Sequence, residues 1–547
     1  MPLQTMLTPG RRQEMVAAGL WPDRLLLDDF DRVVTSDPER VAIVQRSPAS
    51  GARLALTYGE LARRVERIAL GLVALGVEAG EVVAFQLPNW WQFTALHLAC
   101  LRIGAITNPL MPIFRQRELR YMLSFGGAKV MVVPEEFRGF GYAAMMAELK
   151  PELPELRRVF AIGGKGEESF ESYFLERAWE REMDAAVVFA ARRLRPDDVV
   201  QILYTSGTTG EPKGVMHTSN TLLAGLPAYV ERVGLSGRDA VFMASPLAHQ
   251  TGFLYGLMMP IVLGTRCVLQ DVWMPDSAVR AIAEEGCAFT MASTPFLADL
   301  AASPEVPKQD LGRFRAFLCA GAPIPPILVQ DAQEKLKIRV ISAWGMSENG
   351  VVTATRTEDT PEKVVGTDGC ALRGFEVRVV DDAGLVVPPG IEGRLQTRGA
   401  GNFVGYIKKP DLYQTDAEGW FETGDVARMD EDGYIRICGR IKDIIIRGGE
   451  NIPVVEVESL LYRHPAVLAV AIVAAPDPRL GERALAYVTV KPGAELTFEE
   501  MSAFLTKEKL AKNYFPEKLV TIEEMPRTAS GKIQKFRLRE MEAALAS

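Results

Sequence analysis

The sequence predicts an α/β protein, and three observations support this fold class. Short apolar runs such as 81–87 and 199–203 alternate with segments of helical periodicity until past residue 340. After about residue 365 the pattern changes to short strands and turns, and the C-terminal part again alternates strands with helices. Strands that alternate with helices form mostly parallel sheets, because a crossover helix returns the chain to the same end of the sheet.

The first elements follow from residue periodicity and end signals. Residues 57–78 are expected to form an amphipathic helix, since Thr57 and Glu60 make a capping box and apolar residues recur at helical spacing. The next expected elements are a buried strand, a helix that ends at a glycine, and a short β-branched strand: 81–87, 89–103 and 129–133.

The second half of the chain divides into two further parts. Short strands separated by Asp-Asp-Ala-Gly and Pro-Pro-Gly turns predict an antiparallel, barrel-like subdomain: 374–380, 385–387 and 393–397. Mixed strands and helices then predict a small α+β domain: strands 468–473 and 484–490, helices 454–464 and 498–509. We place the boundary at Lys442, in a charged segment between two strand-like runs.

Composition and charge exclude several classes of protein. With 547 residues, 48% hydrophobic and 24% charged, the chain is expected to be globular and to contain more than one domain. A net charge of −8 gives no basic surface for nucleic acid or an anionic membrane. The six cysteines and four histidines show no metal-binding spacing, and no secretory signal or membrane-spanning run is found. We therefore expect a cytoplasmic protein without a transmembrane segment or a nucleic-acid partner.

A loop rich in glycine and hydroxyl side chains follows the apolar run 199–203. It reads Thr205-Ser206-Gly207-Thr208-Thr209-Gly210-Glu211-Pro212-Lys213. Glycines let successive N–H groups turn toward one anion, hydroxyls add donors, and the lysine adds a mobile positive charge. It is not a Walker A loop, because no Gly-Lys-Ser/Thr opens a following helix. The combination predicts a polyphosphate site and disfavours a merely solvated loop.

Two downstream segments offer surfaces for a nucleotide base and a metal. Gly321-Ala322-Pro323 follows an expected strand and lets a flat base approach the backbone, although a simple turn explains it equally well. Trp344-Gly345-Met346-Ser347-Glu348 combines a ring that can stack on a purine with a carboxylate that can hold Mg²⁺. Taken alone, this segment is equally consistent with a core tryptophan beside a surface glutamate.

Three segments nearer the C-terminus carry charge or paired glycines. Asp425 ends an expected strand and can accept both hydroxyls of a ribose, and Arg440 can bind the other side of that sugar. Gly448-Gly449 lets the backbone lie against a slender ligand, and Lys532 projects from a loop of small residues. Taken singly, Asp425 and Lys532 are more typical of solvated charges.

Together, in this order and spacing, the motifs resemble those of the adenylate-forming superfamily. This superfamily includes acyl-CoA synthetases, peptide-synthetase adenylation domains and firefly-type luciferases. The resemblance runs from Thr57 to Lys532. It implies a large N-terminal domain at 1–441, made of two α/β lobes and a distorted β-barrel, and a small mobile α+β domain at 442–547 that turns about Lys442.

The resemblance also implies which residues bind ATP. The phosphate loop grips the β- and γ-phosphates through Thr205, Ser206, Gly207, Thr208, Thr209 and Lys213. The adenine lies between two segments that contain Gly321, Ala322, Pro323, Trp344, Gly345 and Met346. Ser347 and Glu348 serve the phosphates and Mg²⁺, with Glu348 as the metal ligand. Asp425 and Arg440 hold the ribose, and Asn451 faces the nucleotide.

The remaining matches concern the reaction. Lys532 matches the catalytic lysine that bridges the substrate carboxylate and the α-phosphate. His249 matches a gating position beside the acyl pocket, although a structural histidine is the alternative. Gly448 and Gly449 match a loop that lines the pantetheine tunnel for CoA. Trp344 stands where Tyr is commoner and Ser347 where Thr is commoner, and each keeps the physical role of the residue it replaces.

The identity of the acid is less sharply indicated. Segment 245–253 lacks the Asp that binds the α-amino group in amino-acid adenylation domains, so an amino acid is disfavoured. Gly345 stands where acetate-specific relatives carry a bulky Trp, which leaves room for a larger acyl group. Segments 87–93 and 108–114 resemble the branch of short- to medium-chain and alicyclic acyl-CoA ligases, for which cyclohexanecarboxylate is a representative acid.

The expected function is therefore an ATP-dependent carboxylic acid–CoA ligase that forms acyl-AMP and then acyl-CoA. Its small-molecule partners are the acid, ATP and CoA, and a homo-oligomer stays open. Transfer of the acyl group to a carrier protein is the main alternative. A non-catalytic nucleotide-binding protein and a luciferase-like oxidation are the others.

Overall fold

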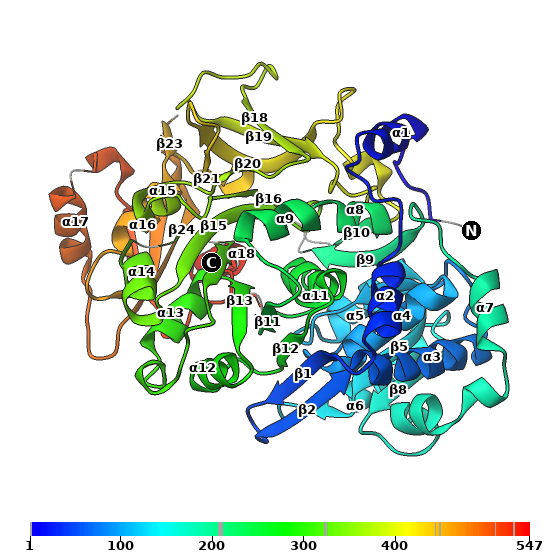
Figure 1. Ribbon diagram of the computed structural model, residues 1–547. Coiled ribbons are helices and arrows are strands. Elements are labelled where there is room, and N and C mark those ends of the chain that lie inside the picture. The colour runs from blue at the N-terminus through cyan, green and yellow to red at the C-terminus, as the bar shows by residue number, and fades with distance from the viewer. Residues whose placement is uncertain are drawn as a thin grey trace.

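The computed structural model describes residues 3–205, 212–321, 324, 326–443, 445–447, 450–477, 479–508, 510–528 and 531–546. Within these residues the chain forms four larger sheets and a two-stranded ribbon, and helices cover the parallel ones (Figure 1). The predicted α/β class is confirmed.

A six-stranded sheet forms the first lobe, in the order β10-β9-β4-β3-β5-β8. It is parallel except for the hairpin of β9 and β10. Its strands are β3 (Val82–Phe85), β4 (Ile106–Pro109), β5 (Ala128–Pro134), β8 (Arg158–Ile162), β9 (Val199–Thr205) and β10 (Lys213–Thr218). The accompanying helices are α3 (Tyr58–Ala74), α4 (Trp91–Ile103), α5 (Gln116–Gly126), α6 (Tyr142–Leu149) and α7 (Ala185–Ala191), and the ribbon is β6 (Glu136–Phe137) with β7 (Phe140–Gly141).

The elements expected between residues 57 and 133 are found in this lobe. The capping box is formed in both directions at the start of α3, where Thr57 accepts from the Glu60 N–H and Glu60 accepts from the Thr57 N–H. Helix α4 ends at Gly104, which takes a left-handed conformation with φ 74°. Glycine adopts this conformation without a Cβ penalty, which explains the stop.

A nine-stranded sheet forms the second lobe, in the order β17-β16-β15-β14-β13-β11-β12-β1-β2. Its strands are β1 (Val41–Ser47), β2 (Ala52–Thr57), β11 (Ala240–Met243), β12 (Cys267–Gln270), β13 (Cys287–Ala292), β14 (Ala316–Ala320), β15 (Arg339–Met346), β16 (Gly350–Ala354) and β17 (Cys370–Ala371). The helices of this part are α8 (Ser219–Ala224), α9 (Leu226–Val233), α12 (Pro275–Glu284), α13 (Thr294–Ala302), α14 (Pro326–Asp331) and α15 (Pro361–Gly366). The central strands are parallel and both ends of the sheet are antiparallel.

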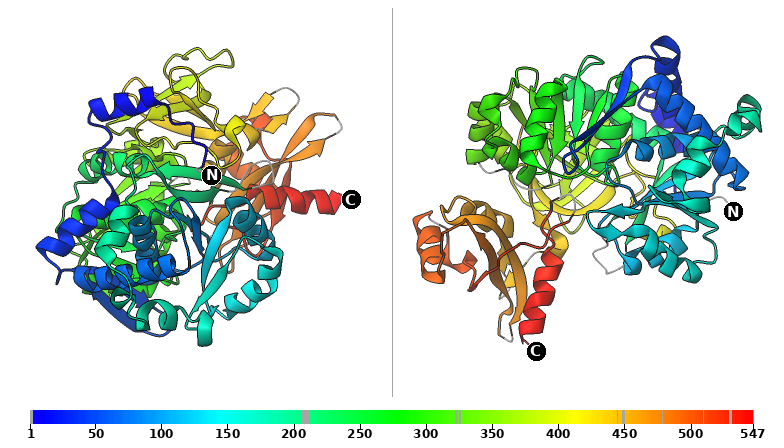
Figure 2. Two further views of the ribbon diagram at one scale, coloured as in Figure 1. Left: turned by 90° about the vertical axis from the view of Figure 1, so that its right-hand side faces the viewer. Right: turned by 90° about the horizontal axis from the view of Figure 1, so that it is seen from below.

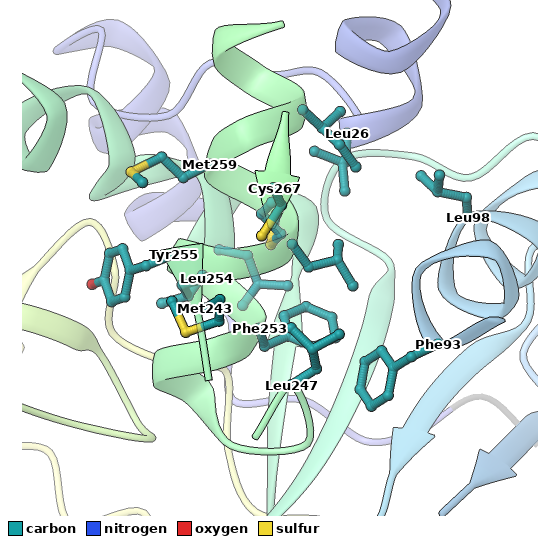
Figure 3. Packing of buried hydrophobic residues seen from close by; sticks show 14 of the residues in the cluster. Leu26, Phe93, Leu98, Met243, Leu247, Phe253, Leu254, Tyr255, Met259 and Cys267 are labelled. Atoms are coloured by element: carbon teal, nitrogen blue, oxygen red, sulfur yellow. The ribbon is translucent and has the colours of Figure 1, made fainter. Parts of the chain in front are cut away.

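One helical run joins the hydrophobic cores of the two lobes. It consists of α10 (Gln250–Gly252), a π-helical segment (Phe253–Met258) and α11 (Met259–Leu263). The Phe253 ring packs against Phe93 of α4 on one side, while residues of β11 and β12 such as Met243 pack beside the same run (Figure 3). One hydrophobic core therefore contains residues of both sheets.

The antiparallel subdomain is a four-stranded sheet of β18 (Phe375–Val380), β19 (Gly393–Gly399), β20 (Phe421–Met429) and β21 (Ile435–Arg440). Single bridges from Cys370 to Tyr434 and from Val215 to Tyr406 connect this part of the chain with both lobes. The strand expected at 385–387 is wrong: only one isolated bridge forms there, and Leu385 is 68% exposed. These residues belong to the long β18–β19 connection, in which Leu385 and Val386 are exposed and only Val387 packs partly against the main core.

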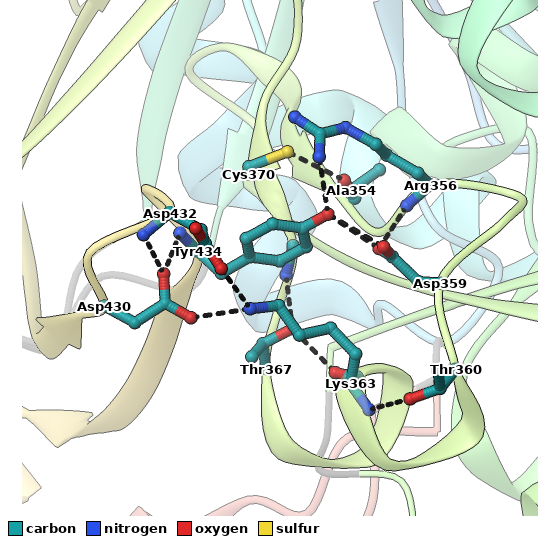
Figure 4. A network of polar contacts seen from close by, with 11 residues as sticks. Ala354, Arg356, Asp359, Thr360, Lys363, Thr367, Cys370, Asp430, Asp432 and Tyr434 are labelled. Atoms are coloured by element: carbon teal, nitrogen blue, oxygen red, sulfur yellow. Dashed lines mark hydrogen bonds and ion pairs between the residues drawn. The ribbon is translucent and has the colours of Figure 1, made fainter.

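A polar network fastens the β20–β21 hairpin to α15 (Figure 4). The Lys363 ammonium lies 2.8 Å from Asp430 and 4.0 Å from the centre of the Tyr434 ring. The Tyr434 hydroxyl lies 2.9 Å from both carboxylate oxygens of Asp359, and it accepts from Arg356 at 3.1 Å. The hairpin that carries Asp425 and Arg440 is thereby held against the second lobe.

The C-terminal part has its own sheet and its own hydrophobic clusters. Its strands are β22 (Ile445–Arg447), β23 (Glu450–Ile452), β24 (Val467–Asp477), β25 (Gly481–Val490) and β26 (Lys518–Thr521), and its helices are α16 (Val454–Leu461), α17 (Phe498–Lys507) and α18 (Lys535–Ala546). Figure 2 shows it as a separate body beside the yellow antiparallel subdomain. The N-terminal helices α1 (Pro9–Ala17) and α2 (Leu26–Ser36) pack on the opposite, larger part.

Candidate active site

Asp425 stands at the centre of a buried hydrogen-bond network. It lies on β20 and is only 4% exposed. Its Oδ1 accepts from Arg440 Nε at 2.7 Å, and its Oδ2 accepts from the indole N–H of Trp344 at 2.9 Å. Register pairing of Asp425 with Arg440 across β20 and β21 explains the first contact. Each carboxylate oxygen keeps a further lone pair, so the group can still accept two hydroxyls.

Glu348 is the second buried carboxylate of the site. It is 6% exposed, and its Oε1 accepts from the Tyr406 hydroxyl at 2.7 Å. The Lys213 ammonium lies 4.9 Å from the centre of the same tyrosine ring. Burial raises the pKa of Glu348, while the Tyr406 hydrogen bond and the charges of Arg440 and Lys213 act against this rise. A buried carboxylate surrounded by donors and cations is suited to binding a metal ion or a proton.

Tyr406 is held in place by backbone pairing. The Ile407 N–H donates to Gly214 O at 2.9 Å, and the Met216 N–H donates to Gly405 O at 3.0 Å. Strand β10 begins at Lys213, the last residue of the phosphate loop, and pairs with the segment that contains Tyr406. The other end of the phosphate loop, Thr205, faces Lys213 across the hairpin.

Lys532 reaches this site from the C-terminal part. A tight loop presents it: the Thr528 N–H donates to Lys532 O at 2.7 Å, and the Lys532 N–H donates to Thr528 Oγ1 at 3.0 Å. Its Cε would lie 2.6 Å from a Cβ placed on Gly321, and its Nζ 3.4 Å. A Cβ on Gly531 would lie 2.7 Å from Ser293 Oγ, so the loop rests on the start of α13. Glycines at 321 and 531 thus permit the close approach.

The electrostatics of Lys532 link it to the rest of the site. Although Lys532 is exposed as a whole residue, its ammonium group lies among protein atoms, and this burial lowers its pKa. Arg440 lowers the pKa further, whereas Asp425 and Glu348 raise it. The four charges are therefore close enough to act on one another, which brings together residues far apart in the sequence.

His249 lies beside the same ammonium group. Its Nδ1 accepts from the Thr251 N–H at 3.3 Å at the start of α10. Burial, followed by the charge of Lys532, lowers the pKa of His249 to about 3. The imidazole is therefore neutral near pH 7, with its proton on Nε2 because Nδ1 is an acceptor.

Gly345 is required by packing within the second lobe. A Cβ at this position would lie 2.0 Å from the backbone oxygen of Gly350. The clash arises at a bulge in the β15–β16 pairing, between Trp344 and Gly345. Space for an acyl group is thus not the only reason for a glycine here.

A small cavity of about 10 Å³, enough for one water molecule, is formed by chain segments next to the site residues. Its walls are formed by His217, Thr221, Leu222, Gly225, Leu226, Gln250, Leu254, Tyr255, Asn349, Gly350 and Val351. Gln250 follows His249, and Asn349 follows Glu348, so the cavity shares two chain segments with the site. His217 Nε2 donates to the backbone oxygen of Ser347 at 2.8 Å, which makes a third link.

Several expected site residues lie outside the described residues, namely Ser206, Gly207, Thr208, Thr209, Ala322, Pro323, Gly448 and Gly449. The backbone of Asn451 is in β23, and that of Lys442 is in a 3₁₀ turn, Ile441–Asp443. Roles for these residues stay predictions. The sequence interpretation missed Tyr406. Its hydrogen bond to Glu348 joins residues 58 positions apart, and no motif indicates that contact.

Two other kinds of feature are absent from the described residues. No group of three or more His, Cys, Asp or Glu side chains there is placed to hold a metal ion. None of the described helices combines the length and the apolar character that a membrane crossing requires.

Comparison with known proteins agrees with the geometry. The family of AMP-binding enzymes matches residues 30–407, and the C-terminal domain of AMP-binding enzymes matches 456–532. A medium-chain fatty-acid–CoA ligase of Escherichia coli is 39% identical over 97% of this chain and 92% of its own. A putative acyl-CoA synthetase, YngI of Bacillus subtilis, is 32% identical over 93% and 96%.

Solved structures show the same similarity. An anthranilate CoA ligase, AuaEII, in complex with anthranoyl-AMP superimposes with a TM-score of 0.85 at 25% identity, covering 96% of this chain and 98% of that one. ATP-bound MatB from Rhodopseudomonas palustris gives a TM-score of 0.82 at 27% identity, covering 96% and 100%. This chain therefore belongs to the AMP-binding enzymes of the adenylate-forming superfamily, and within them to the acyl-CoA synthetases.

Proposed function

We propose that this protein joins a short- to medium-chain or alicyclic carboxylic acid to CoA at the expense of ATP. The observation that carries this proposal is the position of Lys532, whose ammonium group lies over Gly321 and within electrostatic range of Asp425, Glu348 and Arg440. A cation delivered by one part of the chain to buried carboxylates of another is suited to a reaction between two anions.

The first half-reaction follows from this placement. A carboxylate oxygen of the acid attacks the α-phosphorus of ATP, and the bond from that phosphorus to the bridging oxygen breaks, so pyrophosphate leaves. Both reactants are negative, and Lys532 offsets their repulsion where they meet. Asp425, oriented by Arg440 and Trp344, holds the ribose and fixes the direction of the nucleotide.

Magnesium fits the residues around the phosphates. Glu348 supplies one hard oxygen ligand, and Mg²⁺ usually takes one or two carboxylates together with phosphate oxygens. When bound, the ion neutralises phosphate charge. We propose Glu348 as its protein ligand, with Ser347 and Lys213 beside the phosphates.

The second half-reaction needs a different arrangement. The CoA sulfur must attack the acyl carbonyl carbon and expel AMP, yet Lys532 fills the approach beside Gly321 in this structure. We propose that residues 442–547 rotate about Lys442, withdraw Lys532 and bring Gly448-Gly449 to line the pantetheine. The separate hydrophobic clusters of the C-terminal part support its movement as a unit.

The choice of acid rests on the relatives and on the sequence resemblance. The E. coli relative acts on medium-chain fatty acids by name, and the structural neighbour AuaEII acts on a ring acid. We propose an aliphatic chain or a six-membered ring such as that of cyclohexanecarboxylate from the resemblance of segments 87–93 and 108–114 to medium-chain and alicyclic acyl-CoA ligases. Transfer to a carrier protein is the alternative acceptor. We also propose the cytoplasm as the compartment, because all six cysteines are free.

The experiment measures both half-reactions with a panel of acids. Acid-dependent exchange of pyrophosphate into ATP tests adenylation, and release of AMP with CoA or with a phosphopantetheinylated carrier protein identifies the acceptor. We expect exchange with C6–C10 acids and cyclohexanecarboxylate, and turnover with free CoA. Absence of exchange with every acid, or a strict preference for a C16 acid, would contradict the proposal.

A further inference from the structure

Helix α1 carries a cation whose hydrogen-bond partners lie near residue 400 (Figure 1). Nη1 of Arg11 donates to Phe403 O at 3.1 Å and to the Tyr413 hydroxyl at 3.3 Å. Its Nη2 donates to Asn402 O. All three acceptors are neutral groups, and burial lowers the pKa of the guanidinium. The contacts satisfy donors that are otherwise costly to bury, and they tie the helix to residues 402 and 403.

A single peptide group connects Arg11 with Glu348. The carbonyl of this group belongs to Asn402 and accepts from Arg11. The N–H of the same group belongs to Phe403 and donates to the backbone oxygen of Glu348 at 2.7 Å. Hydrogen bonds in such a chain polarise one another. The guanidinium therefore strengthens the contact that fixes the backbone of Glu348.

The side chain of Glu348 is held by the same segment of the chain. Tyr406 donates to Glu348 Oε1 at 2.7 Å, and its ring packs edge to face on Phe403 with the ring centres 4.7 Å apart. Residues 402–406 thus hold Glu348 at both its backbone and its carboxylate. Any shift of these residues moves both contacts.

The charge of Arg11 also reaches the residue before Glu348. Burial, and in smaller part the charge of Arg11, lowers the pKa of His217 to about 4. Nε2 of this histidine donates to Ser347 O at 2.8 Å. The guanidinium therefore lies close behind the Ser347–Glu348 segment.

We propose that Arg11 is a positioning residue for Glu348, the carboxylate that we assign to Mg²⁺. Arg11 acts through the Asn402–Phe403 peptide group and not by contact with the reactants. The inference rests on the proposed role of Glu348, and it makes the N-terminal helix a part of the active site. Without Arg11 the segment 402–406 loses its outer support, so the carboxylate is held less precisely and binds the metal–nucleotide complex less tightly.

The test measures nucleotide binding by calorimetry in Arg11→Met, which removes the donors and keeps an apolar side chain. The ligand is α,β-methylene-ATP, which cannot be adenylated, and it is titrated once with Mg²⁺ and once with excess EDTA. We expect the Kd with Mg²⁺ to rise by roughly 10-fold, the usual effect of losing hydrogen bonds from a charged group. The Kd in EDTA should stay near the wild-type value, because Glu348 then holds no metal.

Arg12→Met is the matched control, since it removes the neighbouring guanidinium of the same helix. Arg12 forms ion pairs with Asp23, at 2.9 Å, and with Asp197, and neither partner belongs to segment 402–406. Its Kd should stay near the wild-type value under both conditions.

The two half-reactions give a second reading. In Arg11→Met, adenylation at subsaturating Mg²⁺, followed by ATP–pyrophosphate exchange, should slow by a similar factor. Thioester formation from synthetic acyl-AMP and CoA involves no triphosphate and should keep its wild-type rate. Thermal unfolding checks that the variant is folded. If it is not, Arg11→Lys is measured in its place, because lysine keeps the charge and loses the paired contacts of the guanidinium.

The outcomes separate this inference from the proposed function. Unchanged binding with Mg²⁺ in a folded Arg11 variant would overturn the inference. Equal losses with and without Mg²⁺, or in both half-reactions, would also overturn it, since Arg11 would then only anchor the helix. If no acid supports exchange in the wild type, the ligase proposal fails, whereas the binding measurement still tests Arg11 because it needs no acid.

Discussion

The indole N–H of Trp344 donates to Oδ2 of Asp425 at 2.9 Å, although the two residues lie on different sheets. An aromatic ring expected to stack on adenine thus also orients the carboxylate expected to hold the ribose. Phenylalanine at this position would keep a stacking face and lose the hydrogen bond, so the two roles can be separated.

Trp344→Phe should raise the KM for ATP by about 10-fold or more, because a hydrogen bond to a charged group contributes roughly 1.5–3 kcal/mol. The maximal rate should change less than the KM. The measurement is ATP–pyrophosphate exchange at saturating acid with ATP varied. An unchanged KM would show that Asp425 does not depend on the indole N–H.

Tyr406→Phe should shift the acidic limb of the adenylation rate to higher pH. The Tyr406 hydroxyl favours the ionised form of Glu348, whose pKa burial raises, so its loss raises that pKa further. Magnesium binding needs the ionised carboxylate, and adenylation therefore requires more alkaline conditions in the variant. Adenylation rates of the wild type and the variant, measured from pH 4 to 8 at fixed Mg²⁺, test this prediction. Superimposable profiles would show that the Tyr406 hydroxyl does not affect the ionisation that limits adenylation.

Adenylation should also fall at high pH, at a midpoint below the ordinary lysine value of 10.5. The reason is that burial and Arg440 lower the pKa of Lys532, and only the protonated amine offsets the meeting of two anions. The effect of the same group on stability has the opposite sign. Between the lowered pKa of Lys532 in the folded state and 10.5, the lysine binds more protons in the unfolded state than in the folded state. Its contribution to the free energy of unfolding therefore rises as the pH rises. If the adenylation rate of Lys532→Ala fell at high pH with the same midpoint, the fall would belong to another ionisable group.

Gly345→Ala should reduce the free energy of unfolding by about 1–3 kcal/mol, the usual cost of overpacking. The added Cβ would lie 2.0 Å from the backbone oxygen of Gly350. The clash is costly because a backbone atom cannot swing aside as the end of a flexible side chain can. Gly366→Ala is a fitting control, because nothing lies within 4 Å of its Cβ position. Denaturant unfolding measures the free energy of unfolding of Gly345→Ala and Gly366→Ala. Equal values would mean that the backbone at the β15–β16 bulge shifts to accept the added methyl group.

Much of the fold could be predicted from local patterns in the sequence. The helix over 57–78 is found as Tyr58–Ala74 because its capping box and apolar spacing are set by neighbours along the chain. The prediction of a strand at 385–387 was wrong, because an apolar run can also lie in an exposed connection. Whether such a run forms a strand depends on tertiary contacts, which the local sequence does not show.

The site was predictable only in part. Asp425, Glu348 and Lys532 were proposed from motifs, and the structure places their charges close enough to act on one another. Tyr406 was not proposed, because its hydrogen bond to Glu348 depends on a contact between residues far apart in the chain. The rotation about Lys442 and the roles of Gly448 and Gly449 stay predictions.

The most direct test of the account measures the two half-reactions separately in Lys532→Ala, with Lys518→Ala as a surface control that pairs only with Glu542 among the contacts described. Adenylation, followed by ATP–pyrophosphate exchange, should slow by roughly 10²–10³-fold, the range for losing one electrostatic stabiliser. Thioester formation from synthetic acyl-AMP and CoA should proceed at nearly the wild-type rate. Equal losses in both half-reactions would contradict the claim that Lys532 serves only the first.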